Sequence, residues 1–111
     1  LRQGEMLDVS GLHERLAGEA APLVLDVRGA EEFDGEQGHI PGALNIPLDA
    51  LKTRLPELAE YQEKSVVLVC RTDIRSAKAA LLMAKQGFAH LHVIKQGMTA
   101  WNQAGFAVEK A

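Results

Sequence analysis

Short apolar runs rich in β-branched residues alternate with segments of helical spacing along the chain, and this alternation limits the possible folds more than any other feature. The pattern predicts strands at 7–9, 23–27, 44–46, 65–69 and 91–94. It predicts helical segments at 10–18, 31–36, 49–58, 76–86 and 98–104. Because strands that alternate with helices build βαβ units, we expect an α/β fold with a central, mainly parallel sheet and helices on both faces.

Local chemistry adds detail to the helical segments. Ser10 and Asp49 are suited to cap two of the helices, and Pro56 is expected to end or kink the second of these. Ser76 is expected to open the longest helix. The apolar stripe of that helix is expected to face the core and consists of Ala77, Ala80, Leu81, Ala84 and Phe88.

Length and composition fit a single domain that spans residues 1–111. The chain is 47% hydrophobic and 24% charged, which is typical of a folded globular domain. Its formal net charge of −3 argues against nucleic-acid binding. No apolar run reaches the roughly 18–20 residues of a membrane span, and no secretory signal opens the chain, so we expect a cytoplasmic location and no membrane partner. The chain begins with Leu1 rather than Met, which suits a domain excised from a larger protein.

The single cysteine, Cys70, carries the strongest indication of chemistry. One thiol excludes an internal disulfide, a cysteine-rich zinc site and a self-contained iron–sulfur site, and no metal site or cofactor is predicted elsewhere. Cys70 follows the strand at 65–69, at the sheet edge where open α/β sheets bind ligands. Arg71, Arg75, the loop amides and the following helix dipole all favour the thiolate. These features predict a nucleophile, whereas the alternative is a small buried residue at the end of a core strand.

Other charged residues close to this edge are less specific. Asp73 lies inside the loop, where its carboxylate opposes both a thiolate and an anionic substrate. We interpret Asp73 as a turn former, with an ion pair to a loop arginine or a left-handed backbone as alternatives. Asp26 and Arg28 also lie at a strand end and are interpreted as a structural ion pair or loop anchor, with a place in the lining of the site as the alternative. No histidine is singled out by the sequence as a general base for Cys70.

Four segments, in order along nearly the whole chain, resemble a single-domain rhodanese, a sulfurtransferase module. They are Leu25-Asp26-Val27-Arg28 with Glu32-Phe33, the run from Gly38 to Pro47 (GHIPGALNIP), the run from Cys70 to Ser76 (CRTDIRS), and Gly97-Met98 with Trp101, Gly105 and Phe106. The resemblance implies a rhodanese-like α/β fold with a parallel sheet of about five strands. Two positions depart from the family pattern, because Asp73 and Gln96 stand where glycine is usual.

The resemblance also implies a mechanism. The Cys70 thiolate would attack the sulfane sulfur of a small anionic donor such as thiosulfate and become a persulfide. Cyanide, a small thiol or a protein thiol would then accept that sulfur. The implied substrate-binding loop consists of Arg71, Thr72, Asp73, Ile74 and Arg75. Its amides would hold the persulfide, Arg71 and Arg75 would bind the donor, and the charge of Asp73 predicts poor use of thiosulfate.

Two other functions compete with the sulfurtransferase. A phosphatase of the related cell-cycle type needs five residues between its cysteine and arginine, whereas only four separate Cys70 from Arg75, so the loop is one residue short. A non-catalytic rhodanese-like domain with a binding or regulatory role is disfavoured by the intact cysteine and mildly favoured by Asp73. The sequence names no physiological donor or acceptor and no oligomeric state.

Overall fold

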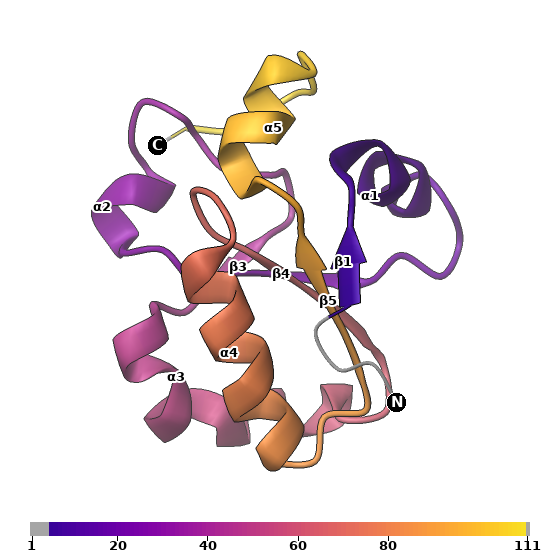
Figure 1. The fold of residues 1–111 in the computed structure, drawn as a ribbon, viewed down its shortest axis with the longest axis vertical. Coiled ribbons are helices and arrows are strands. Elements are labelled where there is room, and N and C mark those ends of the chain that lie inside the picture. The colour runs from indigo at the N-terminus through magenta and orange to yellow at the C-terminus, as the bar shows by residue number, and fades with distance from the viewer. Residues whose placement is uncertain (1–4, 111) are drawn as a thin grey trace.

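The apolar runs predicted as strands form one fully parallel sheet (Figure 1). The computed structural model describes residues 5–110 and orders the strands β1-β5-β4-β2-β3. The strands are β1 (Glu5–Leu7), β2 (Leu23–Asp26), β3 (Leu44–Asn45), β4 (Ser65–Val69) and β5 (His90–Ile94). Every residue of β4 after Ser65 is buried, because helices cover both faces of a central parallel strand.

The helical segments divide between the two faces of the sheet. They are α1 (Val9–Leu16), α2 (Ala30–Phe33), α3 (Leu48–Arg54), the 3-10 helix η1 (Leu55–Tyr61), α4 (Ile74–Lys85) and α5 (Gly97–Gln103). Residues of α3, η1 and α4 pack on one face, while residues of α1 and α5 pack on the other. None of these helices is long and apolar enough to cross a membrane within the described part of the chain.

The alternation of side chains along β4 decides on which face the cysteine lies. Val66, Leu68 and Cys70 pack into the core beneath α3 and α4, whereas Val67 and Val69 pack beneath α1 and α5. This is the two-residue period of an extended strand, continued one residue beyond its end. The Cys70 side chain therefore belongs to the α3–α4 face.

Two predicted helix caps are wrong. Asp8, rather than Ser10, caps α1 through its Oδ1 atom, which accepts a hydrogen bond from the Gly11 amide at 2.8 Å. Pro47, rather than Asp49, precedes the first residue of α3. At α1 two plausible capping residues, Asp8 and Ser10, lie close together, whereas at α3 no side chain makes a capping hydrogen bond. The expectation for Pro56 is confirmed, because the chain changes from α-helix to 3-10 helix at Leu55.

Helix α4 begins two residues earlier than predicted and buries only part of the predicted stripe. Ala80 and Phe88 are buried as expected, whereas Ala77 is exposed and Leu81 is 64% exposed. The other buried residues of the helix are Ser76, Ala79 and Met83. Apolar residues lie on more than one side of this alanine-rich helix, so its periodicity does not define one face. The earlier start places Arg75 and Ser76 in the first turn of α4, and this changes what the two side chains can reach.

Candidate active site

The Cys70 sulfur is buried at the carboxyl end of β4, with Ser76 beside it. Only 1% of the Cys70 surface is exposed, and Ser76 is fully buried. The Ser76 amide donates a hydrogen bond to Sγ at 3.4 Å, and the Ser76 hydroxyl lies 3.3 Å from the same sulfur. The Ser76 hydroxyl also donates to the Asp73 carbonyl at 3.3 Å. Ser76 is thus a site residue that sequence reasoning treated only as the start of a helix.

Helix α5 holds the loop from the opposite face of the sheet. The Met98 amide donates to the Cys70 carbonyl at 2.9 Å, and the Thr99 amide donates to the Arg71 carbonyl at 3.1 Å. In a trans peptide the carbonyl and the next amide point in opposite directions. The amides of Arg71 and Thr72 therefore point away from α5, toward the face on which the Cys70 side chain lies.

Gly97 allows this close contact between α5 and the loop. Its φ is +40°, a conformation that side chains disfavour. A Cβ atom at this position would lie 2.5 Å from the Thr72 carbonyl oxygen and closer still to that of Cys70. The preceding Gln96 has a left-handed backbone with φ of 60°, which explains why glycine is usual there. Gly97 was part of a quoted motif, but its contact with the loop was not predicted.

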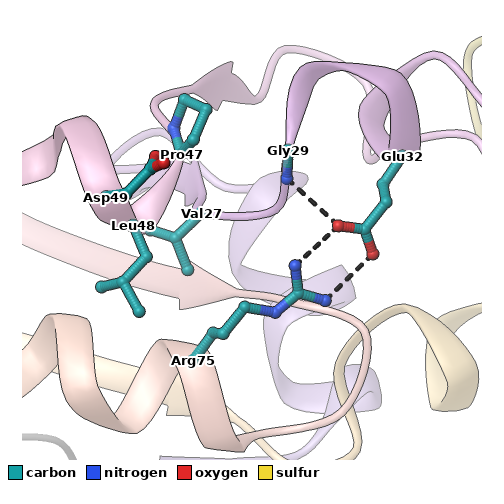
Figure 2. A pocket seen from close by; sticks show the side chains of 7 residues that line it. All are labelled: Val27, Gly29, Glu32, Pro47, Leu48, Asp49 and Arg75. Carbon is teal, nitrogen blue, oxygen red and sulfur yellow. Dashed lines mark hydrogen bonds and ion pairs between the residues drawn. The ribbon is translucent and has the colours of Figure 1, made fainter.

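The two arginines of the loop have different surroundings. Arg71 is exposed, and its side chain has no hydrogen bond or ion pair within residues 5–110. Arg75 makes a bidentate ion pair with Glu32 of α2, with Nη1–Oε1 at 2.6 Å and Nη2–Oε2 at 2.9 Å. Figure 2 shows the Glu32 carboxylate held between this guanidinium and the Gly29 amide, which donates at 3.2 Å. The positive charge of Arg75 is therefore already paired.

This ion pair shifts the pKa of both partners. The hydrogen bonds from Arg75 lower the pKa of Glu32 from 4.5 to about 2, with the Gly29 amide acting in the same direction. The same hydrogen bonds raise the pKa of Arg75 above its ordinary value. Attraction to the Asp26 carboxylate acts weakly in the same direction. Both members of the pair are thus ionised near neutral pH.

The remaining loop residues are arranged around the start of α4. Asp73 immediately precedes the helix with φ of −144°, so its backbone is not left-handed, and it forms no ion pair with either loop arginine in the described chain. Its interpretation as a turn former agrees with this position. Thr72 is half-buried, and Ile74 is 65% exposed as the first residue of α4.

Two cavities flank the Glu32 carboxylate. The first has a volume of about 440 Å³ and is lined by Val27, Gly29, Glu32, Pro47, Leu48, Asp49 and Arg75 (Figure 2). The second has a volume of about 480 Å³ and includes both Arg71 and Glu32 in its lining. Val27 and Cys70 pack in the same core cluster, so the first cavity lies on the face of the sheet that carries the sulfur.

A buried ion pair at the end of β2 supports the neighbouring loops, as predicted. Asp26 and Arg28 are each 1% exposed, with Oδ2 and Nη2 2.8 Å apart. Arg28 also donates to the Gly38 carbonyl at 2.8 Å, and Asn45 donates to the carbonyls of both Asp26 and Arg28. These bonds join β2 and β3 to the segment that carries Gly38, so the pair anchors loops.

Histidines take no part in the hydrogen bonds of Cys70 within residues 5–110. His39 stacks on Phe33 with ring centroids 3.7 Å apart and bonds to the Phe33 carbonyl through Nδ1. His13 stacks on Phe106 at 4.0 Å. In the described chain, no group of three or more potential ligand side chains is arranged to hold a metal ion.

Comparison with known proteins connects this geometry to a family. Residues 8–104 match the family model of the rhodanese-like domain. The chain belongs to the rhodanese-like domain family. This confirms the family suggested by the four sequence motifs, together with the rhodanese-like α/β fold.

Individual relatives of this rhodanese-like domain differ in length. It is 40% identical over 85 residues to YqhL of Bacillus subtilis. The aligned region covers 77% of this chain but only 64% of YqhL, which is less than two thirds of the length of that protein. It is 30% identical over 102 residues to a protein of Allochromatium vinosum named sulfurtransferase, with 92% of each chain covered. The solved structure of the human single-domain sulfurtransferase TSTD1 matches with a TM-score of 0.78 and 26% identity, over 90% of this chain and 96% of that one.

Proposed function

We propose that this rhodanese-like domain is a sulfurtransferase that carries sulfane sulfur as a persulfide on Cys70. The observation that carries the proposal is the position of the buried thiol at the end of β4, with the amide of Ser76 donating to its sulfur. The names of the Allochromatium vinosum and human relatives support the same activity. Covalent catalysis by cysteine requires a thiolate, which hydrogen-bond donors and nearby cations stabilise.

In the first half-reaction, the Cys70 thiolate attacks the outer sulfur of a sulfane donor. A new S–S bond forms from the thiolate electron pair, while the S–S bond of the donor breaks and its electron pair leaves with the remainder of the donor. With thiosulfate the leaving group is sulfite, and with an organic persulfide it is a thiolate. The loop of Arg71, Thr72, Asp73, Ile74 and Arg75 would surround the transferred sulfur, and the inward orientation of the Arg71 and Thr72 amides supports this role.

In the second half-reaction, a nucleophilic acceptor takes the outer sulfur and the Cys70 thiolate leaves. The chain contains one cysteine, so no second thiol of this chain can resolve the persulfide. The acceptor is therefore an external thiol, cyanide or a thiol of another protein. Arg71, whose side chain is exposed and without an ionic partner in the described chain, is suited to attract an anionic donor or acceptor.

Mass spectrometry of the intact protein tests the proposal. Incubation with thiosulfate or with an organic persulfide should add about 32 Da, one sulfur atom, to Cys70. A thiol added afterwards should remove this mass and release the persulfide of that thiol or hydrogen sulfide. The variant Cys70→Ser should gain no sulfur and keep the circular dichroism spectrum of the folded protein.

The opposite result would favour a different function. If no donor adds sulfur to the folded protein, the sulfurtransferase proposal is wrong and a binding or regulatory role takes its place. Release of phosphate from an aryl phosphate, lost in Cys70→Ser, would instead support the phosphatase.

A further inference from the structure

Glu32 binds the guanidinium of Arg75, the group expected from the sequence to bind the sulfur donor. Its two carboxylate oxygens bond separately to the two terminal nitrogens of Arg75, at 2.6 and 2.9 Å, and the Gly29 amide donates to Oε1. A bidentate arrangement of this kind uses the geometry with which arginine binds any planar oxyanion. A donor oxyanion that approaches Arg75 must therefore compete with a carboxylate already in place.

We propose that Glu32 determines donor specificity by acting as an internal anion on Arg75, so that the site favours organic persulfides over thiosulfate. This inference rests on the proposed sulfurtransferase function and deepens it. Of the two loop arginines, only Arg71 remains without an ionic partner in the described chain. One unpaired cation is a weaker site for a dianion than two.

The cavity beside Arg75 has the chemistry expected of such a preference. Val27, Pro47 and Leu48 form its apolar wall, while Asp49, Glu32 and Arg75 contribute two carboxylates and one guanidinium. Because the guanidinium balances only one of the two carboxylates, the excess negative charge opposes a dianionic donor, and the apolar wall can accept the carbon chain of an organic one. The volume of about 440 Å³ lies within the range of cavities that bind small molecules.

The transfer from an organic persulfide is balanced without any further reagent. The thiolate of Cys70 attacks the outer sulfur of R–S–SH, and the bond between the two donor sulfurs breaks. The products are the Cys70 persulfide, which keeps the proton on the outer sulfur, and the thiolate R–S⁻. The organic persulfide enters without the two negative charges of thiosulfate, so its binding depends less on a second free cation in the loop.

The test compares two donors on the wild-type protein and on Glu32→Gln. The rate of sulfur loading on Cys70 is measured by rapid quench and intact mass, with thiosulfate and with hydroxyethyl persulfide. The wild type should load faster from hydroxyethyl persulfide. Glu32→Gln should raise the ratio of the second-order rate constant for thiosulfate to that for hydroxyethyl persulfide about tenfold, the size expected for one charge-assisted hydrogen bond.

Two further variants separate the ion pair from a general effect of charge. Glu31→Gln removes the same charge from the neighbouring residue, which has no ion pair in the described chain. Glu57→Gln breaks the Arg54–Glu57 pair outside the site, where Nε and Oε2 are 3.0 Å apart. Neither should change the preference between donors by more than about twofold.

Three outcomes would overturn the inference while leaving the sulfurtransferase function intact. An equal gain for thiosulfate in Glu31→Gln and Glu32→Gln would show that only net charge matters. A folded Glu32→Gln with the donor preference of the wild type would show that the pair does not control access. If the wild type uses thiosulfate as fast as hydroxyethyl persulfide, it has no preference for the organic donor. This measurement needs no variant, so it decides the question even if Glu32→Gln does not fold. Failure of every donor to load Cys70 would instead refute the sulfurtransferase function, and the inference with it.

Discussion

At the scale of single residues, the Cys70 sulfur has one polar side chain, Ser76, within hydrogen-bond distance among the described residues. The Ser76 hydroxyl lies between the Cys70 sulfur and the Asp73 carbonyl, at 3.3 Å from each. When the sulfur is a thiol, it can donate to Ser76, which in turn donates to Asp73. When the sulfur is a thiolate, the hydroxyl can rotate to donate to it, because a serine hydroxyl has one donor and two acceptor positions. Ser76 can therefore satisfy both protonation states.

This arrangement predicts that Ser76→Ala slows sulfur loading by about fivefold to tenfold, because the thiolate loses one hydrogen-bond donor in a buried site. Rapid-quench mass spectrometry with a sulfane donor measures the loading rate. Ser65→Ala, at the other end of β4, is the matched control and should load at the wild-type rate. Equal rates for Ser76→Ala and the wild type would show that the hydroxyl plays no part in transfer.

At the scale of secondary-structure elements, α5 and α2 position the Cys70 loop from two sides. The first amides of α5 hold the carbonyls of Cys70 and Arg71, and Glu32 of α2 holds Arg75. The first contact requires that no side chain stand at Gly97. The second is electrostatic and depends on the ionisation of Glu32. The loop is thus held by one contact that depends on shape and one that depends on charge.

The shape requirement predicts that Gly97→Ala destabilises the protein by more than about 2 kcal/mol and abolishes sulfur loading, since the added carbon collides with backbone oxygens. Gly105→Ala is a matched control. Gly105 also has a positive φ, of 78°, but nothing lies within 4 Å of a Cβ built there. Gly105→Ala should lower the free energy of unfolding by only about 1 kcal/mol and leave sulfur loading intact. Urea denaturation and the mass assay measure the two effects, and similar losses for both variants would contradict the collision.

The charge requirement predicts a pH dependence of stability. The folded-state pKa of Glu32 is about 2, below its ordinary value of 4.5. The pair with Arg75 therefore contributes stability that is fully present above pH 4.5 and is lost as the pH falls toward 2. Because both side chains are more than a third exposed, at 36% and 41%, solvent screening limits this contribution to about 1 kcal/mol.

Urea denaturation at a series of pH values tests this dependence. The free energy of unfolding of Glu32→Gln should fall less steeply below pH 4.5 than that of the wild type, whereas Glu31→Gln should follow the wild type. Parallel curves for the wild type and Glu32→Gln would show that Arg75 does not stabilise the ionised carboxylate.

At the scale of the whole molecule, the parallel sheet brings the ends of β2 and β4 together, and the loops there need internal support. The buried pair of Asp26 and Arg28 supplies it by bonding to Gly38 and, through the backbone, to Asn45. This joins three segments that are separate in the sequence. The loops around the candidate site are therefore joined by an ion pair that is itself buried.

The buried ion pair between Asp26 and Arg28 predicts that Asp26→Asn destabilises the fold by about 3–5 kcal/mol. The substitution leaves the buried charge of Arg28 without its carboxylate partner. Thermal or urea denaturation measures the loss. Glu57→Gln breaks an exposed pair of the same type and should change stability little. If the two variants were equally stable, the Asp26–Arg28 pair would not support the fold.

Much of the architecture could be predicted from the sequence because its signals are local. The β-branched run of β4 and the alternation of strands and helices define a parallel α/β sheet, and all five strands lie where they were expected to within two residues. Helix boundaries and the buried face of α4 were less certain. Neighbouring residues compete as caps, and an alanine-rich helix has apolar residues on several sides.

The sequence by itself determined the fold class, the family and the cysteine at the end of β4, because strand periodicity and continuous motifs are properties of neighbouring residues. Only the tertiary structure decided which groups surround that cysteine. Glu32 pairs with Arg75 across 43 positions of the chain, and Gly97 meets the Cys70 loop from another helix. Such partners are brought together by packing between distant segments, and no local pattern specifies them. The same physical difference turned Arg75 from a predicted donor-binding cation into one that is already paired.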